Sequence, residues 1–212
     1  LYHSGQMTKT EQVCKELLRI YPQSLTVLNV FGAVLQGQGQ LQQAVQVFDK
    51  VIQLQPDLAE VYSDRGVALK KLGQFESAVD SYDQAIELQP DYTEAYYNRG
   101  IALTEIGQFE SAVDSYDQAI ELKPDFAPAY SNRGNALRDL GQLEEAVDSY
   151  DKAIELQPDD AGAYSNRGNT LRDLGQLKAA VANHQRAASI DPQNGLFWAS
   201  FAECLQDVKF TS

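Results

Sequence analysis

Apolar and small side chains recur along the chain at helical spacing, in pairs of stripes separated by a glycine. Residues 93–126 show the pattern most clearly. The first stripe has the spacing of one helical face and comprises Ala95, Tyr96, Arg99, Gly100 and Leu103. The second stripe keeps the 3–4 spacing of another helix and comprises Phe109, Ala112, Val113, Tyr116, Ala119 and Ile120. Gly107 interrupts the helix between them and Pro124 ends the second one, so the stretch predicts a helix–turn–helix hairpin.

This hairpin pattern returns at a constant interval along the chain. The prolines that end the second helices lie 34 residues apart, at Pro22, Pro56, Pro90, Pro124, Pro158 and Pro192. A fixed period of this size predicts stacked units that share one core. We therefore predict an all-α solenoid without strands, formed as a single domain by residues 1–212. It comprises a partial unit (1–24), five full units (25–58, 59–92, 93–126, 127–160 and 161–194) and a final half unit (195–208).

The ends of the chain break the pattern. Gly5 occupies the place of the turn glycine and residues 13–20 match the second helix, so most of a first helix is missing from the partial unit. The final half unit matches a first helix alone. We expect both ends to be cuts in a longer protein, and terminal units without polar caps leave association through the ends open.

Small residues recur at fixed positions, numbered from the first residue of each unit. Position 8 is a glycine in the middle of the first helix, where it costs about 1 kcal/mol relative to alanine, so we expect it to permit close approach of the backbones. We expect it to face the alanines of position 20, Ala44, Ala78, Ala112, Ala146 and Ala180. Large residues are predicted to fill the spaces between hairpins: Tyr62, Tyr96, Tyr130, Tyr164 and Trp198, with Phe48, Tyr82, Tyr116 and Tyr150.

These residues resemble the pattern of the tetratricopeptide repeat family over essentially the whole chain. The family pattern has an aromatic at position 4, glycines at 8 and 15, alanines at 20 and 27, an aromatic at 24 and a proline at 32. The chain departs from it at Val51, at Cys14 and His184, and at the arginines of position 7. The resemblance implies a right-handed superhelix whose concave groove, lined by first helices, binds peptides or partner proteins.

On that analogy the groove carries a row of amide side chains. Position 6 supplies Asp64, Asn98, Asn132 and Asn166, and position 9 supplies Asn135 and Asn169. An amide offers both a donor and an acceptor, so such a ladder could bind the backbone of an extended chain with little demand on its sequence. The Tyr-Ser-Asn-x-Gly-Asn run at 130–135 and 164–169 resembles the repeat region of O-linked N-acetylglucosamine transferases. The alternative is a row of solvated asparagines that bind nothing.

Other groove positions are aromatic or charged. Position 5 supplies Tyr97, and positions 12 and 13 supply the cations Lys70, Lys71, Arg138 and Arg172. These cations could bind acidic side chains or a terminal carboxylate, or simply form a solvated face. The arginines of position 7, Arg65, Arg99, Arg133 and Arg167, are instead predicted to be structural, with their guanidinium groups reaching Asp83, Asp117 or Asp151.

The composition limits the classes of binding partner and the location that we expect. The net charge of −13 disfavours nucleic acid and anionic membranes. Cys14 and Cys204 lie near opposite ends of the sequence, so we expect free thiols and a reducing, cytoplasmic location. The longest apolar run, residues 25–35, is too short to cross a membrane.

No catalytic, metal-binding or cofactor-binding pattern accompanies the repeats. His3 and His184 are the only histidines, and His184 occupies an aromatic position in the predicted core. We therefore predict a non-catalytic scaffold that binds a peptide or protein segment, without a cofactor. A substrate-recruiting region of a larger bacterial transferase and a self-assembling homo-oligomer remain alternatives.

Overall fold

The computed structural model describes residues 2–210, which form helices joined by short turns and contain no strand. This confirms the predicted all-α class. The helices group into two compact units that divide after Gly107. The predicted single domain and its repeat boundaries stay predictions, and each unit is described by itself.

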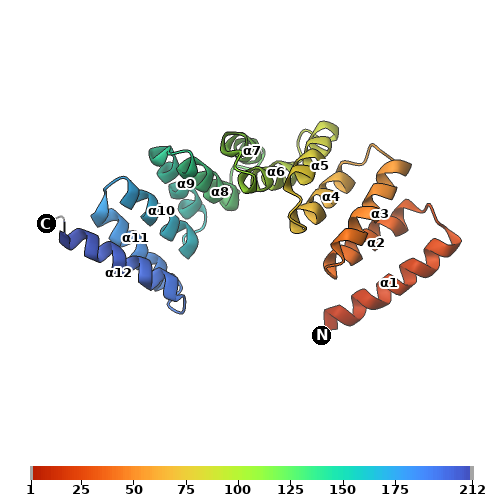
Figure 1. The fold of residues 1–212 in the computed structure, drawn as a ribbon, viewed down its shortest axis with the longest axis horizontal. Helices are drawn as coiled ribbons and strands as arrows, with labels where there is room; N and C mark the ends of the chain where they lie inside the picture. Colours follow the sequence, from red (N-terminus) through yellow and green to blue (C-terminus); the bar gives the residue numbers. More distant parts are fainter. Residues whose placement is uncertain (1, 211–212) are drawn as a thin grey trace. The chain divides into compact units, whose positions relative to one another are not determined.

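The first unit contains six helices in sequential contact (Figure 1). They are α1 (Tyr2–Ile20), α2 (Leu25–Gly37), α3 (Leu41–Leu54), α4 (Ala59–Lys71), α5 (Phe75–Leu88) and α6 (Thr93–Glu105). The pairs α2/α3 and α4/α5 are hairpins, and the first helices α2, α4 and α6 also contact one another in succession. First helices therefore share one side of the unit.

The second unit repeats this arrangement and begins with the second helix of a repeat, α7. Its helices are α7 (Phe109–Leu122), α8 (Ala127–Asp139), α9 (Leu143–Leu156), α10 (Ala161–Asp173), α11 (Leu177–Ile190) and α12 (Gly195–Phe210). Each helix contacts the next, and the first helices α8, α10 and α12 contact in succession. Pro128 lies in the first turn of α8, where its missing N–H removes no helical hydrogen bond.

The turns inside the hairpins depend on glycine, as predicted. Gly107 has φ of 75° and Gly73 has φ of 74°, in the left-handed region that ends helices. At the end of α4, the N–H of Gly73 donates to Lys70 O at 3.0 Å, and the N–H of Gln74 donates to Leu69 O at 3.0 Å. These bonds satisfy carbonyl groups that the helix end would leave without a partner.

The cores of the hairpins that lie within one unit, α2/α3, α4/α5, α8/α9 and α10/α11, differ in one respect from the prediction. The glycine at position 8 faces the aromatic ring of position 24 and not the alanine of position 20. A Cβ atom added to Gly66 would lie 2.6 Å from Tyr82 Cε1, and one added to Gly134 would lie 2.7 Å from Tyr150 Cε1. The aromatic ring thus fills the space within its own hairpin, because only glycine leaves room for it.

Two predictions about the ends of the chain are wrong. Helix α1 continues through Gly5 as a single helix of 19 residues, so the predicted turn there does not form. Trp198 is 45% exposed and does not fill a space between hairpins. Its indole N–H donates to Pro192 O at 3.2 Å.

Both cysteines are buried free thiols. Within residues 2–210, no helix is both long enough and apolar enough to cross a membrane.

Candidate binding surface

Side chains at the predicted groove positions connect neighbouring first helices within each unit. In the first unit, Lys70 Nζ on α4 donates to Asn98 Oδ1 on α6 at 2.7 Å. In the second unit, Asn166 Nδ2 on α10 donates to Asn135 Oδ1 on α8 at 3.1 Å. Groove positions of adjacent first helices therefore lie within hydrogen-bond reach, 12 with 6 in the first unit and 6 with 9 in the second, and form a polar surface in each unit.

The polar surface of the first unit carries both signs of charge. The side chain of Asp64 on α4 is exposed at its surface, but neighbouring groups remove part of the water around its carboxyl group; this partial desolvation and repulsion from Glu60 raise its pKa. Lys70 is half-buried, and burial and the neighbouring Lys71 lower its pKa. Both shifts mean that a charge here is incompletely solvated, so an opposite charge on a ligand would be favoured.

Tyr97 and Asn98 are half-buried on α6. Asn98 uses its carbonyl oxygen for Lys70, while its NH₂ group has no bond among the described residues. A partly used amide can still donate to a ligand carbonyl group.

In the second unit, Asn135 is the centre of an internal network. Its Oδ1 accepts from Asn166 Nδ2 and from the Tyr150 hydroxyl at 2.8 Å. Burial raises the pKa of Tyr150 to about 12, which keeps the hydroxyl a donor. The acceptor of Asn135 is therefore occupied by this chain, which the sequence prediction did not anticipate.

The other amides of the second unit are half-buried, with Asn132 on α8 and with Asn166 and Asn169 on α10. The side-chain oxygen Oδ1 of Asn166 accepts no hydrogen bond among the described residues, and the side chain of Asn169 makes none there. Asn166 and Asn169 lie three residues apart on one helix face, so together they present both donors and acceptors.

The cations at position 12 of the second unit have weak partners. Arg138 lies 3.9 Å from the carboxylate of its neighbour Asp139, and Arg172 lies 3.8 Å from Glu203 Oε2. Both distances exceed a hydrogen bond, and such exposed pairs contribute little. The two guanidinium groups therefore keep most of their capacity for a ligand carboxylate.

The arginines of position 7 have a structural role, as predicted. Arg133 donates through Nε to Asp117 Oδ1 at 2.6 Å and through its NH1 group to Ser149 Oγ at 2.6 Å. Arg65 repeats both bonds with Asp49 and Ser81. Each of these arginines therefore joins the second helices of two consecutive hairpins, a role that binds the stack together and not a ligand.

His184 is fully buried against Gly168, as its aromatic position predicted. Burial lowers its pKa, and neither ring nitrogen has a hydrogen-bond partner among the described residues. The side chain of His3 lies outside the described residues.

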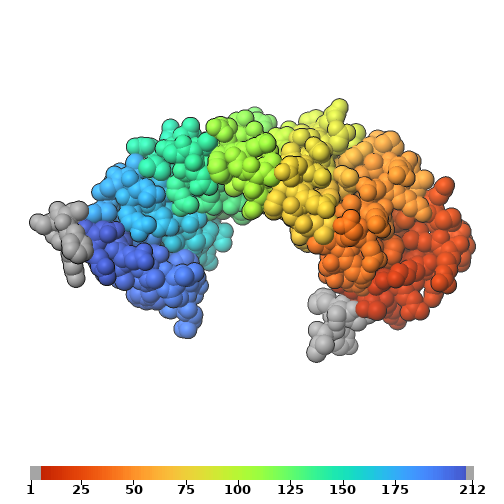
Figure 2. All heavy atoms as spheres, in the orientation of Figure 1, coloured from red at the N-terminus to blue at the C-terminus, as the bar shows by residue number. Residues whose placement is uncertain are grey.

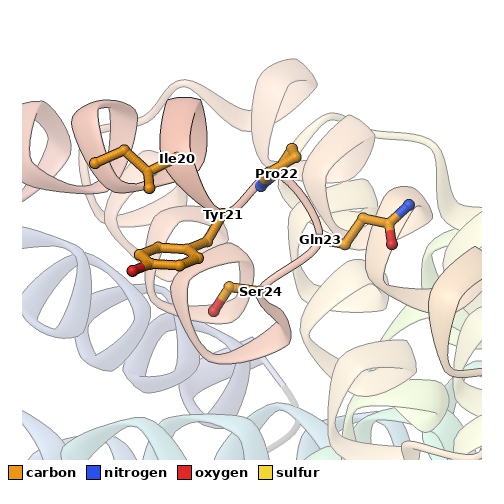
Figure 3. Close-up of a pocket in the computed structure, with 5 residues that line it drawn as sticks. All are labelled: Ile20, Tyr21, Pro22, Gln23 and Ser24. Atoms are coloured by element: carbon orange, nitrogen blue, oxygen red, sulfur yellow. The ribbon is translucent and has the colours of Figure 1, made fainter.

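Asn29 at position 5 of α2 was missed by the sequence reasoning, which considered only the amides of positions 6 and 9. Its Oδ1 is buried without a partner in the described part of the chain. It lines a hollow of about 370 Å³ together with Glu60, Val61 and the residues around them. A second hollow of about 400 Å³, lined by Ile20–Ser24 after α1, contains none of the predicted binding residues (Figure 3).

Family models identify the repeats. The model described as TPR repeat matches residues 32–73, 68–107, 100–137 and 134–172. The model described as tetratricopeptide repeat matches residues 161–194. The chain therefore belongs to the tetratricopeptide repeat (TPR) family, and its fold is an all-α helical-repeat superhelix. Comparison with curated proteins gives no match.

Several solved structures are similar to this chain. YrrB is 21% identical with a TM-score of 0.76, and the match covers 88% of this chain and 96% of YrrB. MamA is 25% identical with a TM-score of 0.74, over 76% of this chain and 95% of that one. A thermophilic TPR protein of Thermus thermophilus, TTC0263, is 21% identical with a TM-score of 0.64, over 86% and 100%. Together with the family, these structures identify a protein-interaction scaffold.

Proposed function

We propose that the first-helix surface binds an extended peptide or protein segment through the backbone of that segment. The observation that carries this proposal is the contact between groove side chains of neighbouring first helices, Lys70 with Asn98 and Asn166 with Asn135. Within each unit, side chains that reach from one first helix to the next form a polar strip, and an extended chain needs such a strip.

The side-chain donors and acceptors that make no bond on these strips match the N–H and C=O groups of a peptide backbone. Asn98 retains its NH₂ donors, Asn166 retains its acceptor, and Asn169 retains both. An extended chain presents N–H and C=O groups in alternation, so it can use the amide of Asn98 in the first unit, or the amides of Asn166 and Asn169 in the second. Each bond adds only about 0.5–1.5 kcal/mol net, so affinity depends on several bonds together.

The cations favour a segment with acidic side chains or a free carboxyl end. Lys70, Arg138 and Arg172 lie at position 12 of their repeat units, six residues or about 1.7 helical turns beyond position 6. Guanidinium groups pair with carboxylates through two parallel hydrogen bonds, which adds specificity to binding by the backbone. The similar structure of YrrB carries the description "a TPR protein with an unusual peptide-binding site", which supports a peptide as the ligand.

A peptide-display screen tests the proposal. The intact chain should enrich extended segments, and the triple variant Asn98→Ala/Asn132→Ala/Asn166→Ala should bind the selected peptides at least tenfold more weakly. A matched control replaces exposed polar residues of second helices, Gln84→Ala/Gln118→Ala, and should bind as the intact chain does. Equal binding by the intact chain and the triple variant would remove the amides from the mechanism.

A further inference from the structure

The hollow that Asn29 lines in the first unit contains none of the binding residues predicted from the sequence. It measures about 370 Å³ and lies among residues drawn in orange and yellow in Figure 2. Its lining comes from α2, from the turn between α3 and α4, from the first turn of α4 and from the end of α5. A volume near the lower end of the range for ligand pockets suits a single long side chain.

The hollow is lined by apolar and by acidic side chains. Leu58, Val61 and Leu88 supply the apolar part. Asp57 and Glu60 are exposed and supply carboxylates. Neither carboxylate forms an ion pair within the part of the chain that the structure describes. The hollow therefore combines a surface for methylene groups with negative charge that this chain does not neutralise.

The side-chain oxygen of Asn29 lacks a donor in the same place. Asn29 Oδ1 is buried on α2 and accepts no hydrogen bond from any described residue. A buried acceptor without a donor destabilises a fold, because it has lost its bonds to water and gained none in return. A ligand in the hollow that donates to Asn29 would supply the missing bond.

The shortage of donors continues one turn further along α4. Asp64 follows Glu60 by four residues, so the two carboxylates share one helix face. Partial desolvation and repulsion from Glu60 raise the pKa of Asp64, and no described residue forms an ion pair with it. The acidic surface therefore extends from the hollow onto the first-helix face.

A second buried oxygen without a partner lies close to this acidic surface. The Tyr82 side chain is fully buried, and its hydroxyl makes no hydrogen bond among the described residues. Burial and the negative charge of Asp64 raise the pKa of Tyr82, so the hydroxyl stays neutral near that carboxylate. In the second unit the equivalent hydroxyl, that of Tyr150, reaches the groove residue Asn135. The Tyr82 hydroxyl is thus directed at the first-helix surface, where no groove residue meets it.

These side chains define the chemistry of a ligand. The side-chain atoms without a partner are all oxygens, so a matching ligand donates hydrogen bonds, and the carboxylates require it to be positive. Among the described residues, no group of three or more histidine, cysteine, aspartate or glutamate side chains is placed to hold a metal ion. An organic cation is therefore the match for this surface.

The first turn of α4 also borders the hollow, and a helix N-terminus favours anions. Its partial charge is equivalent to roughly half a positive charge. Asp57 and Glu60 oppose it with two full negative charges at the same place, so the balance favours a cation.

We propose that this hollow binds the ammonium or guanidinium group of a lysine or arginine side chain. The basic group donates to Asn29 Oδ1 and pairs with Asp57 and Glu60, while its methylene stem contacts Leu58 and Leu88.

The assignment of this side chain to the bound segment rests on the proposed function, because the segment lies along the first-helix strip. Glu60 lies near the start of α4 and Lys70 near its end. The first unit would therefore select a segment that carries a basic side chain for the hollow and an acidic group for Lys70.

Small probes test the hollow without a peptide. The intact chain is titrated with the N-acetyl methylamides of lysine, arginine, norleucine and glutamate, and heteronuclear magnetic resonance follows the Asn29 side-chain amide and the backbone amides of Ala59–Val61. The lysine and arginine probes should shift these signals saturably, with millimolar dissociation constants. The norleucine probe lacks the charge and the glutamate probe reverses it, so neither should produce a saturable shift.

Two charge-matched variants identify the residues responsible. Asp57→Asn/Glu60→Gln should bind the basic probes at least tenfold more weakly. The control Glu76→Gln/Asp80→Asn removes the same charges from exposed positions on α5 and should bind them as the intact chain does. All four positions are exposed, so both variants should fold, and circular dichroism checks their helix content.

The outcomes separate this proposal from the proposed function. The triple variant Asn98→Ala/Asn132→Ala/Asn166→Ala leaves the hollow intact, so it should bind the basic probes normally even where it loses the peptides. Probe binding by a chain that binds no peptide would refute the proposed function and leave the hollow as a cation site. No saturable shift with either basic probe, equal binding of the norleucine or glutamate probe, or unchanged affinity in Asp57→Asn/Glu60→Gln would each overturn the inference.

Discussion

Removal of the phenol hydroxyl at position 24 should have opposite effects in two hairpins. The Tyr150 hydroxyl donates to Asn135 Oδ1 at 2.8 Å. The Tyr82 hydroxyl is equally buried but has no partner among the described residues, because position 9 of its hairpin is Val67. Tyr150→Phe should therefore destabilise the second unit, and Tyr82→Phe should stabilise the first.

The magnitudes follow from the contacts. Tyr150→Phe removes one hydrogen bond, and Asn135 keeps its other donor, Asn166, so we expect a loss of about 1 kcal/mol. Tyr82→Phe removes a buried polar group that no bond compensates, so we expect a gain of about 1–2 kcal/mol. Neither change leaves a cavity larger than one oxygen atom, so the packing contribution is small.

Amide hydrogen exchange measures the opening free energy of each hairpin separately, which suits a repeat protein whose parts open independently. The helices α4 and α5 report on Tyr82, and α8 and α9 report on Tyr150. In a Val67→Asn background the Tyr82 hydroxyl gains an acceptor, so Tyr82→Phe should then destabilise. A loss of stability on Tyr82→Phe in the original background would refute the reasoning.

Two further predictions concern the second unit. Burial holds the pKa of His184 below its usual 6.5, so on acidification the unfolded chain binds a proton before the folded chain does. The free energy of unfolding should therefore fall as the pH drops below about 6.5. His184→Phe should remove this part of the pH dependence in urea unfolding. Arg133→Leu removes the partly exposed ion pair with Asp117 and the hydrogen bond to Ser149, so the free energy of urea unfolding should fall by about 1 kcal/mol. Peptide affinity should not change. A large loss of affinity in the folded variant would contradict the structural role.

The repeat pattern was sufficient to predict the helix pairs and the turns. A constant 34-residue period and a glycine that takes a φ near 75° leave little freedom for another fold. The arginine pairs were also predictable, because an arginine follows an aspartate by 16 residues four times, at Asp49/Arg65, Asp83/Arg99, Asp117/Arg133 and Asp151/Arg167. Arg99 and Asp83 meet at 2.7 Å.

The repeat pattern did not predict which side chains contact one another inside one hairpin. Sequence alone did not distinguish whether Gly66 faces Ala78 or Tyr82, since both are apolar and both recur with it. The internal bond from Asn166 to Asn135 was unforeseen for a similar reason, because an amide can pair with a neighbouring amide as readily as with a ligand. The predicted turn at Gly5 was wrong because a glycine within a helix costs only about 1 kcal/mol, which is too little to end the helix by itself.

The most direct test of the peptide-binding proposal is nuclear magnetic resonance of the asparagine side-chain amides during titration with a selected peptide. Peptide binding on the first helices should shift the NH₂ signals of Asn98, Asn166 and Asn169 and leave those of exposed glutamines on second helices, such as Gln84, unchanged. Shifts confined to second helices, with the three asparagine signals unmoved at saturation, would contradict the account.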